Sequence, residues 1–242
     1  MSGRSAARRR ERWPRDARVA GIMTAARAVF SEKGFAEAST AEIAARAGVV
    51  EGTLYRYFPT KRELLTRVVE AFYEHIFADY EEQLQGVRGT WNRLRFLIWK
   101  HLSVLHADPA LCRLIMHELR PSPQYRGTAI FKLNGRYTER TMAVIREGVA
   151  SGEFGPRVPL KIVRDMIFGF AEHHTWAYLR GEGQFSPELA ADALTDLVYR
   201  GLAREPQVRG KRVDGSVRRL EQAVSRLEEL SGPRRRSRPG AP

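Results

Sequence analysis

Polar side chains suited to nucleic acid are concentrated in one short stretch of this sequence. They are Thr40, Arg46, Glu51, Gly52, Thr53, Tyr55, Arg56, Tyr57 and Lys61. Hydroxyl and ammonium groups bond phosphate oxygens, and we assign that contact to Thr40, Tyr55, Tyr57 and Lys61. Arginine pairs with guanine and a carboxylate accepts from cytosine N4, so we expect Arg56, Thr53 and Glu51 to reach base edges. Arg46 is expected to touch the DNA backbone.

The six histidines raise a different chemistry, metal binding or catalysis. His173 and His174 are adjacent and point to different faces of a helix, and His101 and His106 are five residues apart. Neither spacing suits one metal ion, and the sequence has no His-Glu-x-x-His, Gly-x-Ser-x-Gly, P-loop or dinucleotide motif. We therefore expect that the protein is not an enzyme and holds no cofactor. The alternative is an α-helical metal-binding protein or enzyme that uses the histidines of the C-terminal half.

Aromatic residues are abundant beyond residue 70 and suggest an apolar cavity between helices. Most of them are expected to be core, with a few polar groups that orient a ligand. The candidate effector-binding residues are Phe72, Trp99, His101, Met116, His117, Arg120, Phe131, Arg140, Phe168, His173 and Trp176.

The element that must position the DNA-binding residues is a pair of short helices joined by a tight turn. Ser39 with Glu42 predicts a capping box at the start of a helix that Gly48 ends. A second helix is expected over 53–58, and Pro59 forbids its continuation. Helix, turn and helix is the geometry that inserts its second member into the major groove.

Helices are also predicted throughout the rest of the chain. They are expected over 16–33, 60–84, 90–106, 109–120, 124–150, 159–180 and 186–202. Each has apolar residues three or four positions apart and Gly, Pro or capping residues near its ends. The helix over 60–84 opens with a capping box of Thr60 and Glu63, and its length suggests that it links the first domain to the rest. Without any strand signal, we expect an all-α fold.

Composition bounds the class of protein. The 242 residues, 43% of them hydrophobic, allow one large domain or two small ones. No run of 18 apolar residues occurs, and no apolar stretch follows the arginine-rich N-terminus, so we expect neither a membrane span nor a secretory signal. Cys112, the single cysteine, fits a reducing cytosol, and its apolar neighbours favour a buried thiol over a redox sensor. We expect a cytoplasmic protein.

The net charge of +13 suggests a polyanionic partner, and most of this charge lies near the two ends. Residues 1–14 are expected to form a disordered basic arm, either simply solvated or tracking phosphates. In the basic extension over 204–242, apolar residues at heptad spacing predict a short helix. They are Val213, Val217, Leu220, Val224 and Leu227. That helix would dock on its own dimer or, alternatively, on another protein.

A family resemblance covers roughly residues 15–75. It is carried by Gly34-Phe35, Ile43-Ala44, Ala47-Gly48-Val49, Gly52-Thr53-Leu54-Tyr55, Tyr57-Phe58, Lys61 and Glu63-Leu64-Leu65. This run resembles the DNA-binding domain of the TetR family of bacterial regulators. The family usually has serine at the position of Val50 and often a basic residue at that of Glu51. Without the serine cap, Thr53 becomes the next candidate to cap the second short helix.

A second resemblance lies in the C-terminal half. Its segments are Glu118-Leu119-Arg120, Glu147-Gly148 with Ser151-Gly152-Glu153-Phe154, and Arg164-Asp165-Met166-Ile167-Phe168-Gly169. They resemble the C-terminal domain of TetR regulators of fatty-acid metabolism. The resemblance implies an acyl-CoA ligand and repression that the ligand relieves.

Together these observations predict a homodimeric, ligand-responsive repressor that binds palindromic operator DNA. The expected parts are a basic arm (1–14), a three-helix helix-turn-helix DNA-binding domain (15–75), a helical effector-binding and dimerisation domain (76–203) and a basic extension (204–242). We expect the helices over 159–180 and 186–202 to form the dimer. An effector would tilt the linking helix over 60–84 and so change the separation of the two DNA-binding domains. The rival interpretations are the metal protein or enzyme, and a scaffold that acts through the heptad segment.

Overall fold

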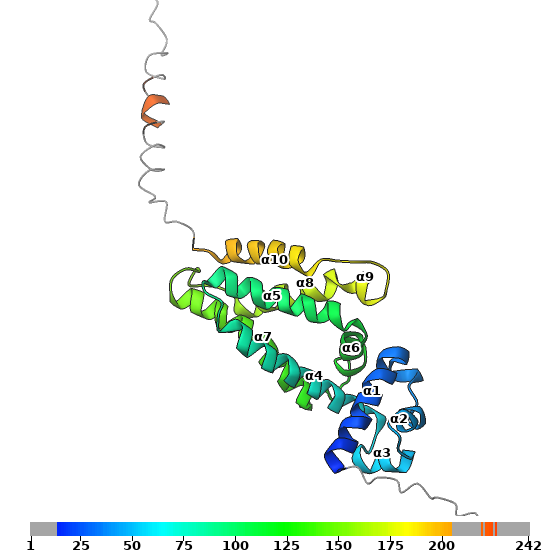
Figure 1. The fold of residues 1–242 in the computed structure, drawn as a ribbon. Coiled ribbons are helices and arrows are strands. Elements are labelled where there is room, and N and C mark those ends of the chain that lie inside the picture. The colour runs from blue at the N-terminus through cyan, green and yellow to red at the C-terminus, as the bar shows by residue number, and fades with distance from the viewer. Residues whose placement is uncertain (1–13, 205–218, 220, 225, 227–242) are drawn as a thin grey trace, which may run out of the picture. The chain divides into compact units, whose positions relative to one another are not determined.

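The computed structural model describes residues 14–204, 219, 221–224 and 226 (Figure 1). The described residues up to Leu202 form one compact unit, and those from Ala203 onward belong to a second. Except for Pro14, the predicted N-terminal arm lies outside the described residues. Of the predicted heptad positions only Val224 is described; it is helical and exposed.

The described chain is helical, which confirms the predicted all-α class. Its α-helices are α1 (Arg15–Glu37), α2 (Thr40–Arg46), α3 (Glu51–Tyr57), α4 (Lys61–Leu84), α5 (Thr90–Ala107), α6 (Pro109–Leu114), α7 (Ala129–Ala150), α8 (Leu160–His174), α9 (Trp176–Leu179) and α10 (Pro187–Leu202). A π-helical turn, η1 (Ile115–Leu119), continues α6, and a 3-10 turn, η2 (Tyr125–Gly127), precedes α7. Among the residues described, none forms a β-strand.

The N-terminal helices α1, α2 and α3 and the start of α4 share one apolar core. Ile22, Phe30, Ile43 and Leu54 are fully buried in it. The same core continues through Leu111 and other residues of α6 and η1. A helix as short as α3 is not stable alone in water, so this packing holds it in place. The helix-turn-helix therefore shares its core directly with α6 and η1.

The C-terminal helices surround a second apolar core. α10 lies along α5, and α7 packs against both α4 and α5 (Figure 1). α4 contributes to both cores and runs without a break through residue 75, where the sequence predicted a domain boundary. One helix thus joins the two cores, as its length suggested.

Two of the predicted helix caps are wrong and one is confirmed. Ser39 precedes α2 but its side chain makes no capping hydrogen bond. The Glu42 carboxylate, which would complete the capping box, pairs instead with Lys33 and Arg46. α3 begins at Glu51, two residues earlier than predicted, so Thr53 lies inside the helix and cannot cap it. At α4, the Thr60 hydroxyl accepts a hydrogen bond from the Glu63 N–H at 3.0 Å, as predicted.

Three predicted helices differ from those in the structure: two are interrupted and one begins later than predicted. The helix expected over 159–180 breaks at Thr175, whose buried hydroxyl donates to the Ala171 carbonyl at 2.8 Å within α8. Such side-chain bonds to the preceding turn bend helices. The helix expected over 109–120 changes to π-helical geometry at Ile115, and the one expected from residue 124 begins only after the Thr128 cap. The break at Thr175 and the π-turn both lie close to residues that line the cavity described below.

Candidate DNA interface and effector cavity

A hydrogen-bonded network joins the two helices of the helix-turn-helix. The Thr40 hydroxyl donates to the Glu51 carboxylate at 2.6 Å and lies 3.0 Å from the Tyr55 hydroxyl. Because the Thr40 proton goes to Glu51, Tyr55 is the donor in the second contact. The network fixes the carboxylate of Glu51 at the first residue of α3, beside the exposed side chain of Val50.

The other predicted DNA contacts on α3 lie at or near the surface. Gly52 and Arg56 are exposed, and Thr53 and Tyr57 are half-buried. The Arg56 guanidinium lies 5.3 Å from the centre of the Tyr57 ring, which is a cation–π contact. Desolvation raises the pKa of the Tyr57 hydroxyl, but Arg56 and Arg18 lower it by more, so this pKa lies below its usual value. The phenol is thus surrounded by positive charge.

Lys61 holds the backbone between α1 and α2. Its ammonium donates to the carbonyls of Phe35, Ala36 and Ala38 at 2.8, 3.2 and 3.0 Å. An ammonium group has three protons, so these bonds use all of them. The structure therefore gives Lys61 a clamping role in place of the free cation that the phosphate assignment needs. It also lies 4.7 Å from the centre of the Phe35 ring.

Arg46 is also occupied within the protein. Its guanidinium bonds the carboxylate of Glu32 on α1 at 2.7 Å and that of Glu42 at 2.8 Å. The hydrogen bonds that Arg46 donates to the carboxylates of Glu32 and Glu42 raise the pKa of Arg46 and lower the pKa of Glu32. Arg46 thus ties α2 to α1, and its expected contact with the DNA backbone stays a prediction.

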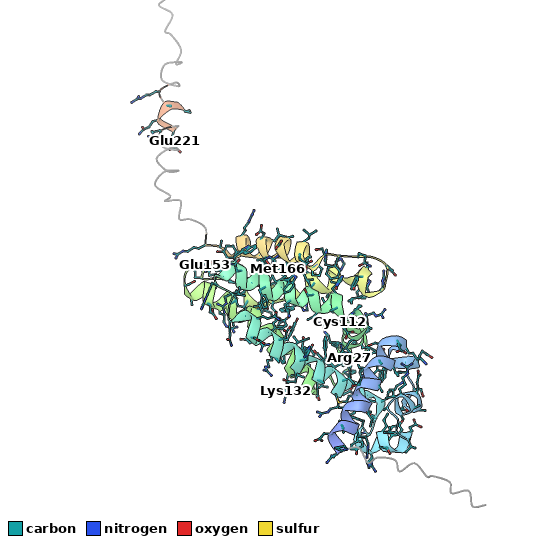
Figure 2. The ribbon with its side chains drawn as sticks, in the orientation of Figure 1. Arg27, Cys112, Lys132, Glu153, Met166 and Glu221 are labelled. Carbon is teal, nitrogen blue, oxygen red and sulfur yellow. The ribbon has the colours of Figure 1, made fainter. Side chains whose placement is uncertain are left out.

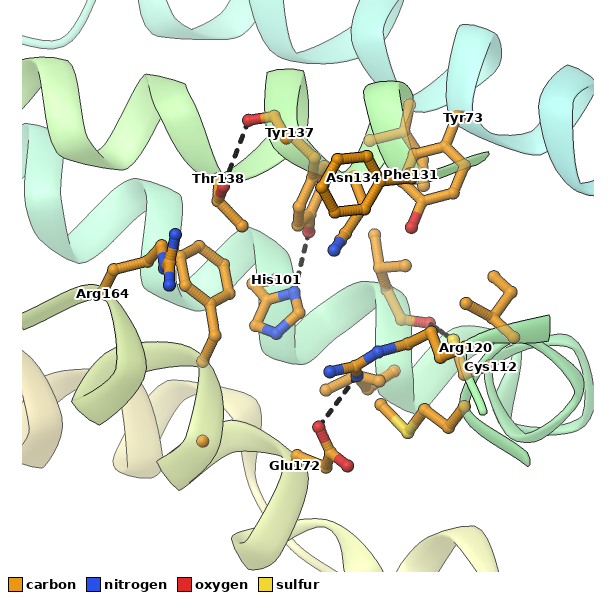
Figure 3. Close-up of a pocket in the computed structure, with 18 of the residues that line it drawn as sticks. Tyr73, His101, Cys112, Arg120, Phe131, Asn134, Tyr137, Thr138, Arg164 and Glu172 are labelled. Carbon is orange, nitrogen blue, oxygen red and sulfur yellow. Dashed lines mark hydrogen bonds and ion pairs between the residues drawn. The ribbon is translucent and has the colours of Figure 1, made fainter. Parts of the chain in front are cut away.

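A cavity of about 690 Å³ lies between α4, α5, α7 and α8 (Figure 3). Six of the predicted effector-binding residues line it: Phe72, His101, Met116, Arg120, Phe131 and Phe168. The lining residues that were not among the predicted effector-binding residues are Tyr73, Ile76, Val104, Leu105, Cys112, Ile115, Tyr125, Arg126, Asn134, Gly135, Tyr137, Thr138, Arg164, Asp165, Gly169 and Glu172. The spacing of Phe131, Asn134, Gly135 and Thr138 along α7 could have revealed this face, since residues three and four apart lie on one side of a helix.

The other five predicted effector residues lie outside this cavity. Trp99 donates to Glu188 of α10 at 3.1 Å, and Arg140 lies 4.8 Å from the centre of the Phe77 ring. His117 packs its ring edge-on against Trp176, and His173 is exposed on α8. None of these five side chains lines the cavity, so their assignment to effector binding stays a prediction.

A hydrogen-bonded chain of three side chains leads from Tyr80, which does not line the cavity, to Tyr137 and His101, which do. The Tyr80 and Tyr137 hydroxyls are 2.9 Å apart, and the Tyr137 hydroxyl lies 2.8 Å from Nδ1 of His101. Burial, and then the nearby charge of Arg120, lower the pKa of His101 to about 4. Burial likewise raises the pKa of Tyr137 well above its ordinary value. All three groups are neutral near pH 7.

Charged residues line the cavity at more than one place. Figure 3 shows the ion pair of Arg120 with Glu172, 2.9 Å long, on one side of His101 and Arg164 on the other. Arg164 pairs with its neighbour Asp165 at 2.8 Å. Arg126 also lines the cavity. An apolar interior with guanidinium groups at its edge suits an amphipathic ligand that carries negative charge at one end.

The histidines do not assemble a metal site within the described part of the chain. No group of three or more His, Cys, Asp or Glu side chains there is placed to hold a metal ion. Cys112 is buried and lines the cavity, and burial raises the pKa of its thiol to about 12. This is the inert, buried thiol that the sequence favoured.

The segments that carry the second resemblance have two different structural roles. Arg120 and the segment from Arg164 to Gly169 supply cavity residues. The segment from Glu147 to Phe154 instead locks helices together: the Phe154 N–H donates to the Gly148 carbonyl at 2.9 Å, and Glu153 accepts from both Thr90 and Tyr199.

Comparison with protein families assigns both halves of the chain. Residues 22–68 match the family model for bacterial regulatory proteins of the tetR family. Residues 88–202 match the tetracyclin repressor-like C-terminal domain. The chain belongs to the TetR family of transcriptional regulators. The two matches together span nearly all of the compact unit that ends at Leu202.

This chain aligns with most of the length of individual TetR-family relatives. The fatty acid metabolism regulator protein of Bacillus subtilis (strain 168) is 25% identical over 181 residues, which is 75% of this chain and 93% of the relative. The transcriptional repressor KstR2 of Mycobacterium tuberculosis (strain ATCC 25618 / H37Rv) is 23% identical over 188 residues, 76% of this chain and 92% of the relative. The crystal structure of FadR from Bacillus subtilis in complex with stearoyl-CoA has a TM-score of 0.67 at 25% identity and covers 76% of this chain and 98% of FadR.

No helix within the described residues is both long enough and apolar enough to span a membrane.

Proposed function

We propose that this TetR-family chain is a repressor that binds palindromic operator DNA as a homodimer and is released by an amphipathic effector such as an acyl-CoA. The observation that carries the proposal is the position of the cavity. Its walls include α4, which opens in the helix-turn-helix core, and η1, which bonds to α4. A ligand there touches the elements on which the DNA-binding helices rest. The relatives named as regulators support a non-enzymatic role.

The proposed DNA interface combines α3 with the network that holds it. Arg56 and Glu51 offer a donor and an acceptor to base edges, while Tyr55, Tyr57 and Thr40 offer hydroxyls to phosphates. A single helix as short as α3 reads few base pairs. Two copies, related by the dimer axis, would read a near-palindrome.

Exposed apolar residues on α8 and α10 support the proposed dimer. On α8, Ile162 lies one turn before Met166, which is labelled in Figure 2. On α10, Leu189 and Leu197 lie about two turns apart. Each of these side chains is at least half exposed in the single chain. Grouped exposed apolar residues mark protein interaction surfaces.

The proposed effector class is supported by both the cavity and the relatives. FadR of Bacillus subtilis was solved with stearoyl-CoA, and it resembles this chain over most of its length. In the present cavity, apolar side chains would hold an acyl chain. The guanidinium groups of Arg120, Arg126 and Arg164 would face the phosphates of a CoA group.

A proposed route connects the cavity to the DNA-binding helices. Ile115 and Met116 of η1 line the cavity. From the same turn, the Glu118 carbonyl accepts from Arg62 of α4 at 3.0 Å. Asp108, at the start of α6, pairs at 2.7 Å with Arg27 of α1. A ligand that displaces η1 would move α6, α1 and α4 together, rather than α4 alone. The ligand must bind the two arrangements with different affinity for this to release DNA.

The proposed domain organisation includes a basic segment at each end of the chain. Operator binding would place the protein in the cytoplasm with the chromosome.

Deletion of the basic arm over residues 1–14 is expected to lower the affinity for DNA and to flatten the salt dependence of binding. An unchanged affinity and salt slope would mean that the arm is inert.

Binding to the DNA upstream of its own gene tests the proposal. Fluorescence anisotropy should give specific binding that weakens as salt rises, and stearoyl-CoA should release the complex. The same DNA with its palindromic half-sites scrambled is the control. Equal binding to both DNAs would overturn the regulator proposal, whereas specific binding that no acyl-CoA releases would overturn only the effector class.

A further inference from the structure

The hydrogen-bonded chain that ends at His101 in the cavity has a direction. Tyr80 is only 3% exposed, and its hydroxyl bonds Tyr137, whose hydroxyl bonds Nδ1 of His101. Each phenol has one proton to donate. If Tyr80 donates to Tyr137, and Tyr137 to His101, both phenol protons are used. In the opposite direction the Tyr80 proton has no acceptor among the described residues, and a buried donor without a partner is costly.

This direction determines which nitrogen of His101 carries the proton. Nδ1 accepts from Tyr137, and the ring is neutral, so the proton resides on Nε2. Figure 3 shows His101 with Nδ1 turned to Tyr137 and its other nitrogen turned into the cavity, on the side toward Arg120. None of the described residues hydrogen-bonds that nitrogen. The cavity thus presents one oriented, neutral donor.

The surroundings of this donor are apolar. The Phe168 ring lies edge-on to His101 with its centre 5.0 Å away, and Val104 and Phe72 line the same cavity. A plain hydrocarbon chain packed against this site would remove Nε2–H from water and leave it unpaired. An anionic oxygen would lose its hydration in these apolar surroundings, and a neutral N–H donor does not compensate for that cost. A neutral oxygen satisfies the donor without adding charge.

We propose that the effector carries a neutral oxygen, a hydroxyl or a ketone, within its apolar part, and that this oxygen accepts a hydrogen bond from Nε2–H of His101. The anionic end of the same molecule lies at the arginines near the edge of the cavity. This inference rests on the proposed effector binding and narrows it, because it disfavours a saturated, unsubstituted acyl chain. His101 is then the residue that determines specificity.

Calorimetric binding without DNA tests the inference directly. The probes are stearoyl-CoA and positional isomers of hydroxystearoyl-CoA and oxostearoyl-CoA. The wild-type protein should bind at least one oxygenated isomer about tenfold more tightly than stearoyl-CoA. His101→Phe should abolish that preference while keeping stearoyl-CoA binding. His75→Phe, which alters an exposed histidine on α4 outside the cavity, should keep the preference.

A second measurement tests the inference on the wild-type protein, so a His101 variant that fails to fold would not affect it. The ¹⁵N NMR spectrum of wild-type His101 should show the Nε2–H tautomer, and Tyr137→Phe should alter it. The Nδ1–H tautomer would overturn the inference. So would stearoyl-CoA binding as tight as that of every oxygenated isomer, or a loss of stearoyl-CoA affinity in His101→Phe, since the thioester carbonyl would then be the acceptor.

The proposed function and this inference fail in different ways. Equal release of operator DNA by stearoyl-CoA and by all oxygenated isomers would support the repressor and refute the oxygen preference. Tight binding of one oxygenated isomer without any release of DNA would support the preference and refute effector control. Absence of binding by every probe would overturn the inference.

Discussion

At the scale of single residues, the cations of the helix-turn-helix differ in what they are free to do. Arg56 is exposed on α3, whereas the ammonium of Lys61 and the guanidinium of Arg46 are bonded to groups of the protein itself. Sequence position alone made all three candidates for DNA contact. The hydrogen bonds now separate a candidate reader from two residues that hold the reading helix in place.

Lys61 offers a clear test of this distinction. Lys61→Met removes three charge-assisted hydrogen bonds to the α1–α2 connection, and we expect a loss of about 1.5–3 kcal/mol in the free energy of unfolding. Urea denaturation measures it. Arg67→Met, which removes an exposed ion pair with Glu70 on the same helix, should change the stability little. Unchanged stability with weaker, less salt-dependent DNA binding would instead support the phosphate contact.

The lowered pKa of buried His101 predicts that the stability of the protein depends on pH. Its pKa is about 4 in the fold, against about 6.5 in the unfolded chain, so the unfolded state binds more protons between these values. Stability from neutral His101 is therefore complete above pH 6.5 and is lost as the pH falls toward 4. From pH 7 to pH 5 the wild-type protein should lose about 2 kcal/mol more than His101→Phe, measured by urea denaturation at both values. Equal losses would contradict the burial of a neutral ring.

At the scale of elements, a tight turn fixes the relative positions of α5, α7 and α10. Phe154 follows α7 and is 1% exposed, and its ring packs over Gly148 of that helix. The neighbouring Glu153 accepts from Tyr199 of α10 and Thr90 of α5. A segment that the sequence linked to ligand response thus positions helices whose other faces build the cavity.

The close approach at Gly148 should not tolerate a methyl group. A Cβ there would lie 2.4 Å from Cδ2 of Phe154, which is held in the core. Gly148→Ala is expected to destabilise the protein by about 1–3 kcal/mol in urea denaturation. Gly135→Ala, on the same helix but with no atom within 4 Å of the new Cβ, should stabilise it by up to about 1 kcal/mol. The opposite order of stability would refute the packing at Phe154.

The proposed coupling through η1 can be separated from ligand binding. Arg62→Ala removes the bond from α4 to the Glu118 carbonyl but leaves the cavity lining unchanged. We expect unaltered effector affinity without DNA and about a fivefold smaller effect of the effector on operator affinity, measured by anisotropy. Arg67→Ala, also on α4, is the matched control. A full effector response in Arg62→Ala would exclude this bond from the route.

At the scale of the whole molecule, exposed apolar side chains lie both on the proposed dimer surface and beside the proposed DNA-binding helix. Those on α8 and α10 suit a second copy of the chain, while Val50 stands beside α3. Cores that share α4 would transmit a change at the cavity to the DNA-binding helices. A dimer would convert such a change into a change of separation between two copies of α3.

The proposed dimer makes a simple prediction. Leu197 is 70% exposed in the single chain, so Leu197→Glu should leave the fold intact yet place a charge in the proposed interface. Analytical ultracentrifugation should then show monomers, with specific operator binding lost. Val50→Glu, which adds the same charge at the helix-turn-helix, should remain dimeric. A dimeric Leu197→Glu would exclude this face.

The sequence by itself determined most of the helices and the helix-turn-helix, because apolar periodicity, glycine ends and proline stops act over neighbouring residues. It also determined that Cys112 would be a buried thiol. Only the tertiary structure decided which charged side chains are free and which residues surround the cavity. Lys61 is occupied by carbonyls more than 20 residues away, and Tyr137 is brought to His101 from another helix. Contacts between residues distant in sequence depend on how helices pack, and local patterns do not specify that.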